Sequence, residues 1–138
     1  MKKSIRYLTF LNILFSLVLV SFPAFALKSD QEFIFISTDD LAKGIKEKSV
    51  FVFDANVPSV YQKNHIPTAM HVNYNSPDLK LLPQNKNASL VFYCKNPHCL
   101  ASHEAAGVAK SNGYTNVRVY PLGIDGWIAA GMLAETVK

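Results

Sequence analysis

Short apolar runs alternate along this chain with longer stretches in which apolar and polar residues are mixed. Two runs, 49–53 and 89–93, are apolar almost throughout and rich in β-branched and aromatic residues, which is typical of strands covered on both faces. Shorter runs of the same kind predict strands at 33–36, 69–72 and 117–120. Helices are predicted at 37–48, 58–63, 102–112 and 123–130, and 76–87 reads as a connection with one helical turn.

Because the predicted strands are separated by helices, they imply right-handed βαβ units. The expected fold is therefore α/β, a single domain with a parallel five-stranded sheet and helices on both faces. The 138 residues suffice for one ordinary domain, and the apolar content of 49% excludes a disordered chain.

The first 26 residues have the pattern of an export signal. A positive start is formed by Lys2, Lys3 and Arg6. An apolar segment, 7–20, follows it, and Ala24-Phe25-Ala26 then matches the A-x-A site of signal peptidase. We therefore expect a signal peptide at 1–26 and a mature domain at 27–138. An uncleaved anchor is the alternative, since 8–26 is just long enough to span a bilayer.

Export of this kind predicts a bacterial periplasmic or secreted protein that has no membrane contact after cleavage. The signal also explains much of the charge: without its three basic residues the formal net charge falls from +4 to about +1. No clustered Lys/Arg stripe remains to neutralise phosphates, so we expect no nucleic-acid partner.

The two cysteines, Cys94 and Cys99, lie only five residues apart. A disulfide here is plausible in an oxidising compartment, but closing so short a loop restrains the unfolded chain rather little. The pair therefore favours chemistry, while a local disulfide that stiffens a turn stays open as an alternative.

Cys94 directly follows the predicted strand 89–93 and precedes a loop and a helix. Active sites of parallel sheets form at the carboxyl ends of strands. Inward-turned amides and a positive helix end stabilise an anion there, which predicts a reactive thiol of lowered pKa. The expected anion-binding loop consists of Lys95, Asn96, Pro97, His98, Cys99 and Leu100. The alternative is a buried structural cysteine that ends a strand.

Two thiols and two imidazoles, which are common metal ligands, occur within ten residues: Cys94, His98, Cys99 and His103. Their spacing matches no standard zinc module, so we expect no metal and no other cofactor. His98 is expected at the mouth of the loop, and His103 on an exposed helix face. Asp54 and His65 are expected to have structural roles.

Three ordered motifs resemble the rhodanese family of sulfurtransferases. The first is Asp54-Ala55 with His65-Ile66-Pro67-Thr68-Ala69, the second is Phe92-Tyr93-Cys94 with Ser102 and Ala105-Ala106, and the third is Leu122-Gly123-Ile124-Asp125-Gly126-Trp127 with Gly131. The resemblance runs from about residue 35 to residue 132 and implies a rhodanese-like fold.

The resemblance also implies a reaction. Cys94 would take a sulfane sulfur from a small donor such as thiosulfate and become a persulfide. Cyanide or another thiol, including a thiol of a partner protein, would then remove it, while backbone amides from Lys95 to Leu100 hold the outer sulfur.

The loop departs from the family's common form. It is two residues longer between Cys94 and Ser102, and Ala101 stands where Arg is usual. Phosphatase chemistry is disfavoured because a tetrahedral oxyanion needs that Arg. Cys99, five residues after Cys94, is the candidate resolving or redox partner: its thiol would attack a Cys94 persulfide or sulfenate and close a disulfide, which would make the protein a redox-switched sulfurtransferase or a thiol oxidoreductase. Two other functions stay open: a thiol–disulfide redox protein using Cys94 and Cys99, and a non-catalytic rhodanese fold that acts as an interaction module.

Overall fold

A five-stranded sheet forms the centre of the protein. The computed structural model describes residues 32–137, so the predicted signal peptide and its cleavage site lie outside the described residues. The strands are β1 (Ile34–Phe35), β2 (Phe51–Asp54), β3 (Met70–His71), β4 (Leu90–Tyr93) and β5 (Val117–Val119). They are all parallel and lie in the order β1-β5-β4-β2-β3, which confirms the predicted sheet.

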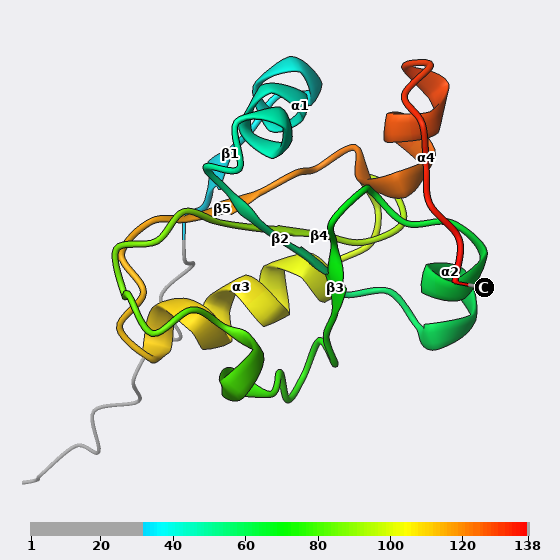
Figure 1. The fold of residues 1–138 in the computed structure, drawn as a ribbon. Coiled ribbons are helices and arrows are strands. Elements are labelled where there is room, and N and C mark those ends of the chain that lie inside the picture. The colour runs from blue at the N-terminus through cyan, green and yellow to red at the C-terminus, as the bar shows by residue number, and fades with distance from the viewer. Residues whose placement is uncertain (1–31, 138) are drawn as a thin grey trace, which may run out of the picture.

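Helices cover both faces of this sheet, as predicted (Figure 1). They are α1 (Thr38–Lys46), α2 (Pro58–Lys63), α3 (Ala101–Ser111) and α4 (Gly123–Ala129), with a short 3₁₀ helix, η1 (Leu79–Leu81), in the predicted connection. In Figure 1, α1 and α4 lie on one side of the sheet and α3 lies on the other. No helix within residues 32–137 is long and apolar enough to cross a bilayer.

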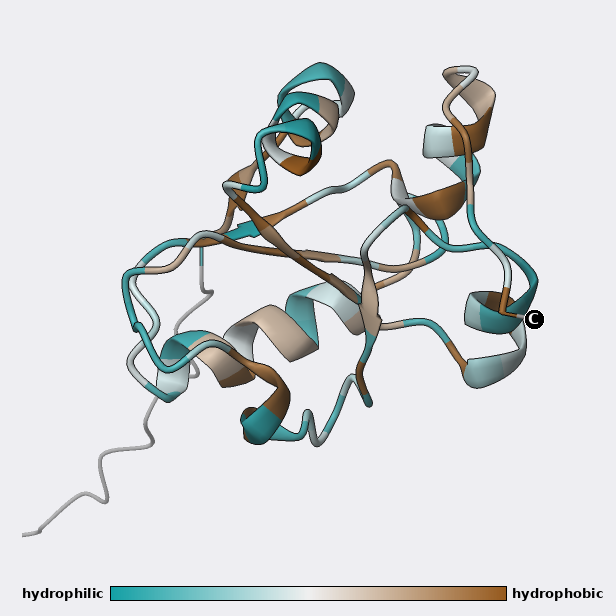
Figure 2. Cartoon of the chain, in the orientation of Figure 1, coloured by the Kyte–Doolittle hydropathy of each residue, from teal (hydrophilic) through white to brown (hydrophobic). Residues whose placement is uncertain are grey.

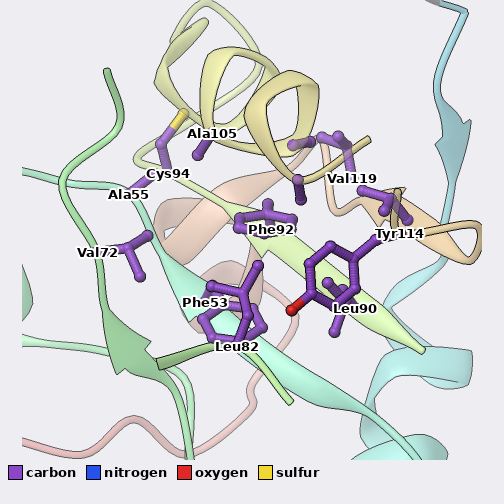
Figure 3. Packing of buried hydrophobic residues seen from close by; sticks show 13 residues of the cluster. Phe53, Ala55, Val72, Leu82, Leu90, Phe92, Cys94, Ala105, Tyr114 and Val119 are labelled. Carbon is purple, nitrogen blue, oxygen red and sulfur yellow. The ribbon is translucent and has the colours of Figure 1, made fainter. Parts of the chain in front are cut away.

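Two apolar cores lie on the two faces of the sheet. The core under α3 includes Phe53, Phe92 and Ala105, and the core under α1 and α4 includes Leu41, Val91 and Trp127. Successive residues of β2 and β4, such as Val52 and Phe53, point into opposite cores, and most of both strands is brown in Figure 2. Figure 3 shows the first core, where Cys94 lies beside Ala55 and Ala105.

Several element boundaries differ from the predictions. Strand β2, predicted at 49–53, spans Phe51–Asp54, and Phe51 is exposed because it lies at the end of the strand, outside both cores. The outer strands β1 and β3 contain two residues each, because each is paired on one side of the sheet. Helix α3 begins at Ala101 with Leu100 as its N-cap, one residue before the predicted start. Helix α1 begins after Ser37, whose side chain accepts a hydrogen bond from the Asp40 amide, as its predicted N-cap role requires.

Candidate active site

The site forms where β4 ends. All four residues of β4 are buried, and Cys94 follows them with only 2% of its surface exposed. Its side chain joins the core under α3 and is bonded through a disulfide to Cys99, with 6.3 Å between the two Cα atoms. That separation is ordinary for a disulfide. The predicted position at the carboxyl edge of a central strand is therefore confirmed, and the two cysteines are paired in this structure.

Asn96 organises the loop between the two cysteines. Its carbonyl oxygen accepts the Cys99 amide at 3.1 Å, and its side-chain oxygen accepts the His98 amide at 3.0 Å. Pro97 has no amide hydrogen to offer. Of the amides expected to face the sulfur, those of His98 and Cys99 are thus used inside the loop in this structure, and the loop makes a tight turn rather than a full ring of donors.

The remaining loop amides are oriented by the start of α4. The Ile124 amide donates to the Cys94 carbonyl and the Asp125 amide donates to the Lys95 carbonyl, both at 3.0 Å. In a trans peptide the carbonyl and the following N–H point in opposite directions. The amides of Lys95 and Asn96 therefore point away from α4, and they are left to stabilise an anion at the strand end.

Gly123 makes this close approach possible. Its backbone has φ of +64°, and a Cβ atom added there would overlap the carbonyl groups of Lys95 and Cys94. A residue with a side chain would push α4 away from the loop. Gly123 is thus the residue that lets α4 hold the two carbonyls.

The amino end of α3 supplies further donors. Leu100 is its N-cap, and no side chain in the described part of the chain caps the helix. Within the described residues the His103 and Glu104 amides donate to the Leu100 carbonyl, whereas the Ala101 and Ser102 amides have no backbone partner. These two amides and the positive end of the helix dipole are therefore available to an anion close to Cys94. Ser102, in the first turn and 2% exposed, places its Oγ 3.4 Å from the Cys94 sulfur. The Cys99 carbonyl oxygen lies 3.1 Å from the same sulfur.

Two opposite charges, Lys95 and Asp125, pair at the mouth of the loop, which is its solvent-exposed side. Lys95 Nζ lies 3.3 Å from the Asp125 carboxylate, and both side chains are about half exposed. Lys95, Pro97, His98 and Leu100 are exposed, which places His98 at the mouth as predicted. Lys95 thus contributes its positive charge at the mouth together with the negative charge of Asp125.

The neighbouring end of β2 has a structural role, as predicted. The Asp54 carboxylate accepts hydrogen bonds from the Tyr93 hydroxyl at 2.6 Å and from the backbone amide of Asn56 at 2.7 Å. The Tyr93 hydroxyl in turn accepts the Ile66 amide at 2.9 Å. Burial raises the pKa of Asp54 above its usual 3.8, against the opposing effect of these hydrogen bonds. His65 binds the Tyr61 carbonyl and lies 3.6 Å from Glu135, which joins the C-terminal segment to the loop after α2.

His103 corrects one prediction, because it is half-buried rather than exposed. Its ring packs edge-on against Phe33 and Phe35, with centroid distances of 5.4 and 6.1 Å. Burial lowers the pKa of this imidazole. The β1 strand lies over the start of α3, a packing that helical periodicity could not reveal. Residues 32–137 contain no group of three or more Cys, His, Asp or Glu side chains placed to hold a metal ion.

Sequence reasoning gave no role to Gly123 or Ser102, although both stand in the quoted motifs. Their functions depend on contacts between segments that are distant in the chain: Gly123 with Lys95, and Ser102 with Cys94. A glycine at the point where a strand turns into a helix was the available signal for a close backbone approach.

The fold and site together define a class: a parallel α/β domain with a cysteine at a strand end, facing an uncapped helix. The model of the rhodanese-like domain family matches residues 37–130, and the chain belongs to that family. It is 33% identical over 101 residues to the thiosulfate:glutathione sulfurtransferase of Saccharomyces cerevisiae, an alignment covering 64% of this chain and 71% of the yeast protein.

Solved structures agree on the fold. The BH2092 protein of Bacillus halodurans superposes with a TM-score of 0.68 at 24% identity, covering 75% of this chain and 77% of its own. SseA of Escherichia coli, a 3-mercaptopyruvate sulfotransferase, superposes with a TM-score of 0.59 at 20% identity, covering 77% of this chain and 52% of SseA. The human single-domain sulfurtransferase TSTD1 superposes with a TM-score of 0.59 at 19% identity, covering 71% of this chain and 97% of TSTD1. The predicted rhodanese-like fold is confirmed, and the chain is similar to sulfurtransferases.

Proposed function

We propose that the protein is an exported sulfurtransferase that carries sulfane sulfur as a persulfide of Cys94. One observation carries this proposal: Cys94 directly follows β4, and the loop 95–100 folds back so that the first turn of α3, which no side chain caps, lies next to its sulfur, with Ser102 Oγ at 3.4 Å. Amide donors at that place favour an anionic sulfur, whether a thiolate or the terminal sulfur of a persulfide. The similarity to the yeast thiosulfate:glutathione sulfurtransferase supports the same chemistry.

The reaction begins from the dithiol form, in which a thiol has opened the Cys94–Cys99 disulfide. The Cys94 thiolate attacks the outer sulfur of a sulfane donor such as thiosulfate. A bond forms between the two sulfurs, and sulfite leaves with the electron pair of the broken bond. An acceptor thiolate or cyanide then attacks the outer sulfur of the persulfide, and the Cys94 thiolate is the leaving group.

The backbone amides of Lys95, Asn96, Ala101 and Ser102, together with the Ser102 hydroxyl, would stabilise the negative sulfur in both steps. The chain itself therefore provides the nucleophile and the anion-stabilising donors. The partners would be a small sulfur-containing donor and a cyanide, thiol or protein-thiol acceptor.

The test is thiocyanate formation from thiosulfate and cyanide by pre-reduced protein. Wild type and Cys99→Ser are expected to form thiocyanate, and Cys94→Ser is expected to lose roughly 10³-fold or more, as removal of a nucleophile does. Other sulfane donors are tried in the same assay. Absence of turnover with every donor, or turnover that survives in Cys94→Ser, contradicts the proposal.

Export is proposed on the pattern of residues 1–26 and has its own test. N-terminal sequencing of the exported protein should begin at Leu27. A product that begins at Met1 and stays with the membrane fraction would instead indicate an anchor.

The disulfide favours a second candidate function, a thiol–disulfide redox protein. This function predicts dithiol oxidation by wild type that is lost equally in Cys94→Ser and Cys99→Ser, without any sulfur transfer to cyanide. A purely non-catalytic role predicts instead that Cys94→Ser folds normally and leaves the phenotype unchanged.

A further inference from the structure

Cys99 lies close enough to Cys94 for the two sulfur atoms to bond. It ends the turn that Asn96 organises and immediately precedes Leu100, the N-cap of α3. Its backbone is held by the hydrogen bond to the Asn96 carbonyl at 3.1 Å, and its sulfur is bonded to that of Cys94. The folded loop thus brings the two sulfur atoms together while the strand and the helix stay in place.

The two cysteines differ in access. Cys94 is 2% exposed, and its sulfur is surrounded by Cys99 and Ser102. Cys99 is half-buried and belongs to a loop whose other residues are largely exposed. Once Cys94 carries a persulfide, an external acceptor can approach its outer sulfur from the mouth. The inner sulfur stays buried, and the thiol that the structure shows within bonding reach of it is Cys99.

We propose that Cys99 is a second catalytic residue, a resolving thiol that releases the carried sulfur as hydrosulfide. This inference rests on the proposed function, because it begins from the Cys94 persulfide. The Cys99 thiolate attacks the inner sulfur of that persulfide. The Cys94–Cys99 bond forms, the bond between the inner and outer sulfurs breaks, and hydrosulfide leaves with its electron pair. The two thiols are oxidised to the disulfide and the sulfane sulfur is reduced.

Hydrosulfide is a suitable leaving group, because sulfur species of low proton affinity leave faster in such exchanges. Attack of Cys99 on the outer sulfur would instead move the persulfide to Cys99 and leave Cys94 as a free thiol. Attack on the inner sulfur forms the direct Cys94–Cys99 bond, and the structure shows that the folded loop can hold the two sulfurs in that bond.

The cycle is completed by a dithiol reductant. Its thiolate attacks Cys99, the more accessible sulfur of the pair, and a second thiol of the reductant then releases both cysteines. With thiosulfate as donor, one thiosulfate and one dithiol give one sulfite, one hydrogen sulfide and one disulfide of the reductant. The protein would therefore supply hydrosulfide to a reaction that consumes reduced sulfur.

The test is a single turnover of pre-reduced protein with excess thiosulfate, without oxygen, reductant or acceptor. Sulfite, hydrosulfide and intact mass are measured together. Wild type is expected to release one equivalent each of sulfite and hydrosulfide and to lose the mass of two hydrogen atoms. Cys99→Ser is expected to release sulfite, gain the mass of one sulfur at Cys94 and release no hydrosulfide. Cys99→Ala is the second variant, and reduced wild type without thiosulfate controls for adventitious oxidation.

The outcomes separate the two proposals. Sulfite with a lasting added sulfur on wild-type Cys94, or with the added sulfur found on Cys99, overturns the resolving role and leaves sulfur transfer intact. Hydrosulfide release that persists in both Cys99 variants also overturns the resolving role. Absence of sulfite from all three proteins, with every sulfane donor substituted for thiosulfate, overturns the proposed function itself and the inference with it.

Discussion

The ends of β2 and β4 lie side by side at one edge of the sheet, but their buried polar groups have different hydrogen-bond surroundings. Asp54 at the end of β2 stands opposite Tyr93 in β4, and each of Asp54 and Cys94 is almost completely buried. The Asp54 carboxylate has its hydrogen bonds supplied by Tyr93 and by the Asn56 amide. The Cys94 sulfur instead lies beside Cys99 and Ser102 at the start of α3, and the carbonyls of Cys94 and Lys95 are held by α4. Burial is common to both ends, and backbone amides without a partner distinguish the β4 end, where we propose the reaction takes place.

Among substitutions that keep both cysteines, the largest expected effect comes from disturbing the donors at the β4 end. Gly123→Ala would place a Cβ against the Lys95 and Cys94 carbonyls and force α4 to move. We expect sulfur transfer to fall roughly 10²-fold, the usual consequence of misplacing a reacting group by about 1 Å. The measurement is the rate of thiocyanate formation.

Gly131→Ala is the matched control for this variant. Gly131 also has a positive φ, +78°, but an added Cβ there meets no atom within 4 Å. It carries similar backbone strain, of order 1–2 kcal/mol, without touching the loop. Equal losses of activity in the two variants would show that strain alone, rather than contact with the loop, explains the effect of Gly123→Ala.

At the β2 end the expected effect is on stability. Tyr93→Phe leaves the Asp54 carboxylate and the Ile66 amide each without their tyrosine partner. We expect the free energy of unfolding to fall by about 1–3 kcal/mol, measured by urea denaturation, while sulfur transfer stays close to wild type.

Tyr120→Phe provides the comparison, since its hydroxyl pairs at 2.8 Å with Thr38 in a partly buried place. Its expected cost is smaller, about 0.5–1 kcal/mol. A loss of activity in Tyr93→Phe as large as in Gly123→Ala would remove the distinction between the two strand ends.

A smaller effect concerns pH. Because burial raises the pKa of Asp54, the native state retains a proton at pH values where the unfolded chain has lost it. Because of this group, the free energy of unfolding therefore falls as pH rises from about 3.8 to the folded-state pKa of Asp54. Above that pKa the effect of Asp54 on stability no longer changes with pH. Asp54→Asn should lose this slope, so that the stability difference between variant and wild type changes across that window. Parallel stability curves at all pH values would contradict the assignment.

The smallest expected effect concerns the exposed Lys95–Asp125 pair. Such pairs contribute at most about 1 kcal/mol, so neither single substitution should change stability by more. Lys95→Gln should raise the KM for thiosulfate about twofold to threefold, and Asp125→Asn should lower it, because the local potential steers a dianion. High salt should abolish both changes. Changes in KM that persist at high salt would indicate direct contact with the donor.

Much of the fold followed from the chain itself. The strand at 89–93, the Ser37 cap and the position of Cys94 depend on local pattern, and the structure agrees with each. The run at 49–53 also forms a strand, but this strand is Phe51–Asp54 and its first residue, Phe51, is exposed rather than buried. Pairing could be anticipated because parallel strands joined by helices leave few arrangements. The short outer strands could not, since their lengths depend on which neighbour they pair with.

The detail of the site was less accessible from the sequence. The Cys94–Cys99 pairing, the consumption of the His98 and Cys99 amides by Asn96, and the contact of Gly123 with Lys95 all depend on three-dimensional approach. Similarly, His103 is half-buried because β1 lies beside α3, a contact between segments about 70 residues apart in the chain.

The most direct test of the account is the position of sulfur after reaction with a sulfane donor. Reduced Cys99→Ser protein is incubated with thiosulfate or another donor, without acceptor, and is then digested and mapped by mass. One added sulfur on the peptide that contains Cys94 is the predicted result. An unmodified Cys94 that still reacts normally with an alkylating reagent, after every donor tried, would contradict the account.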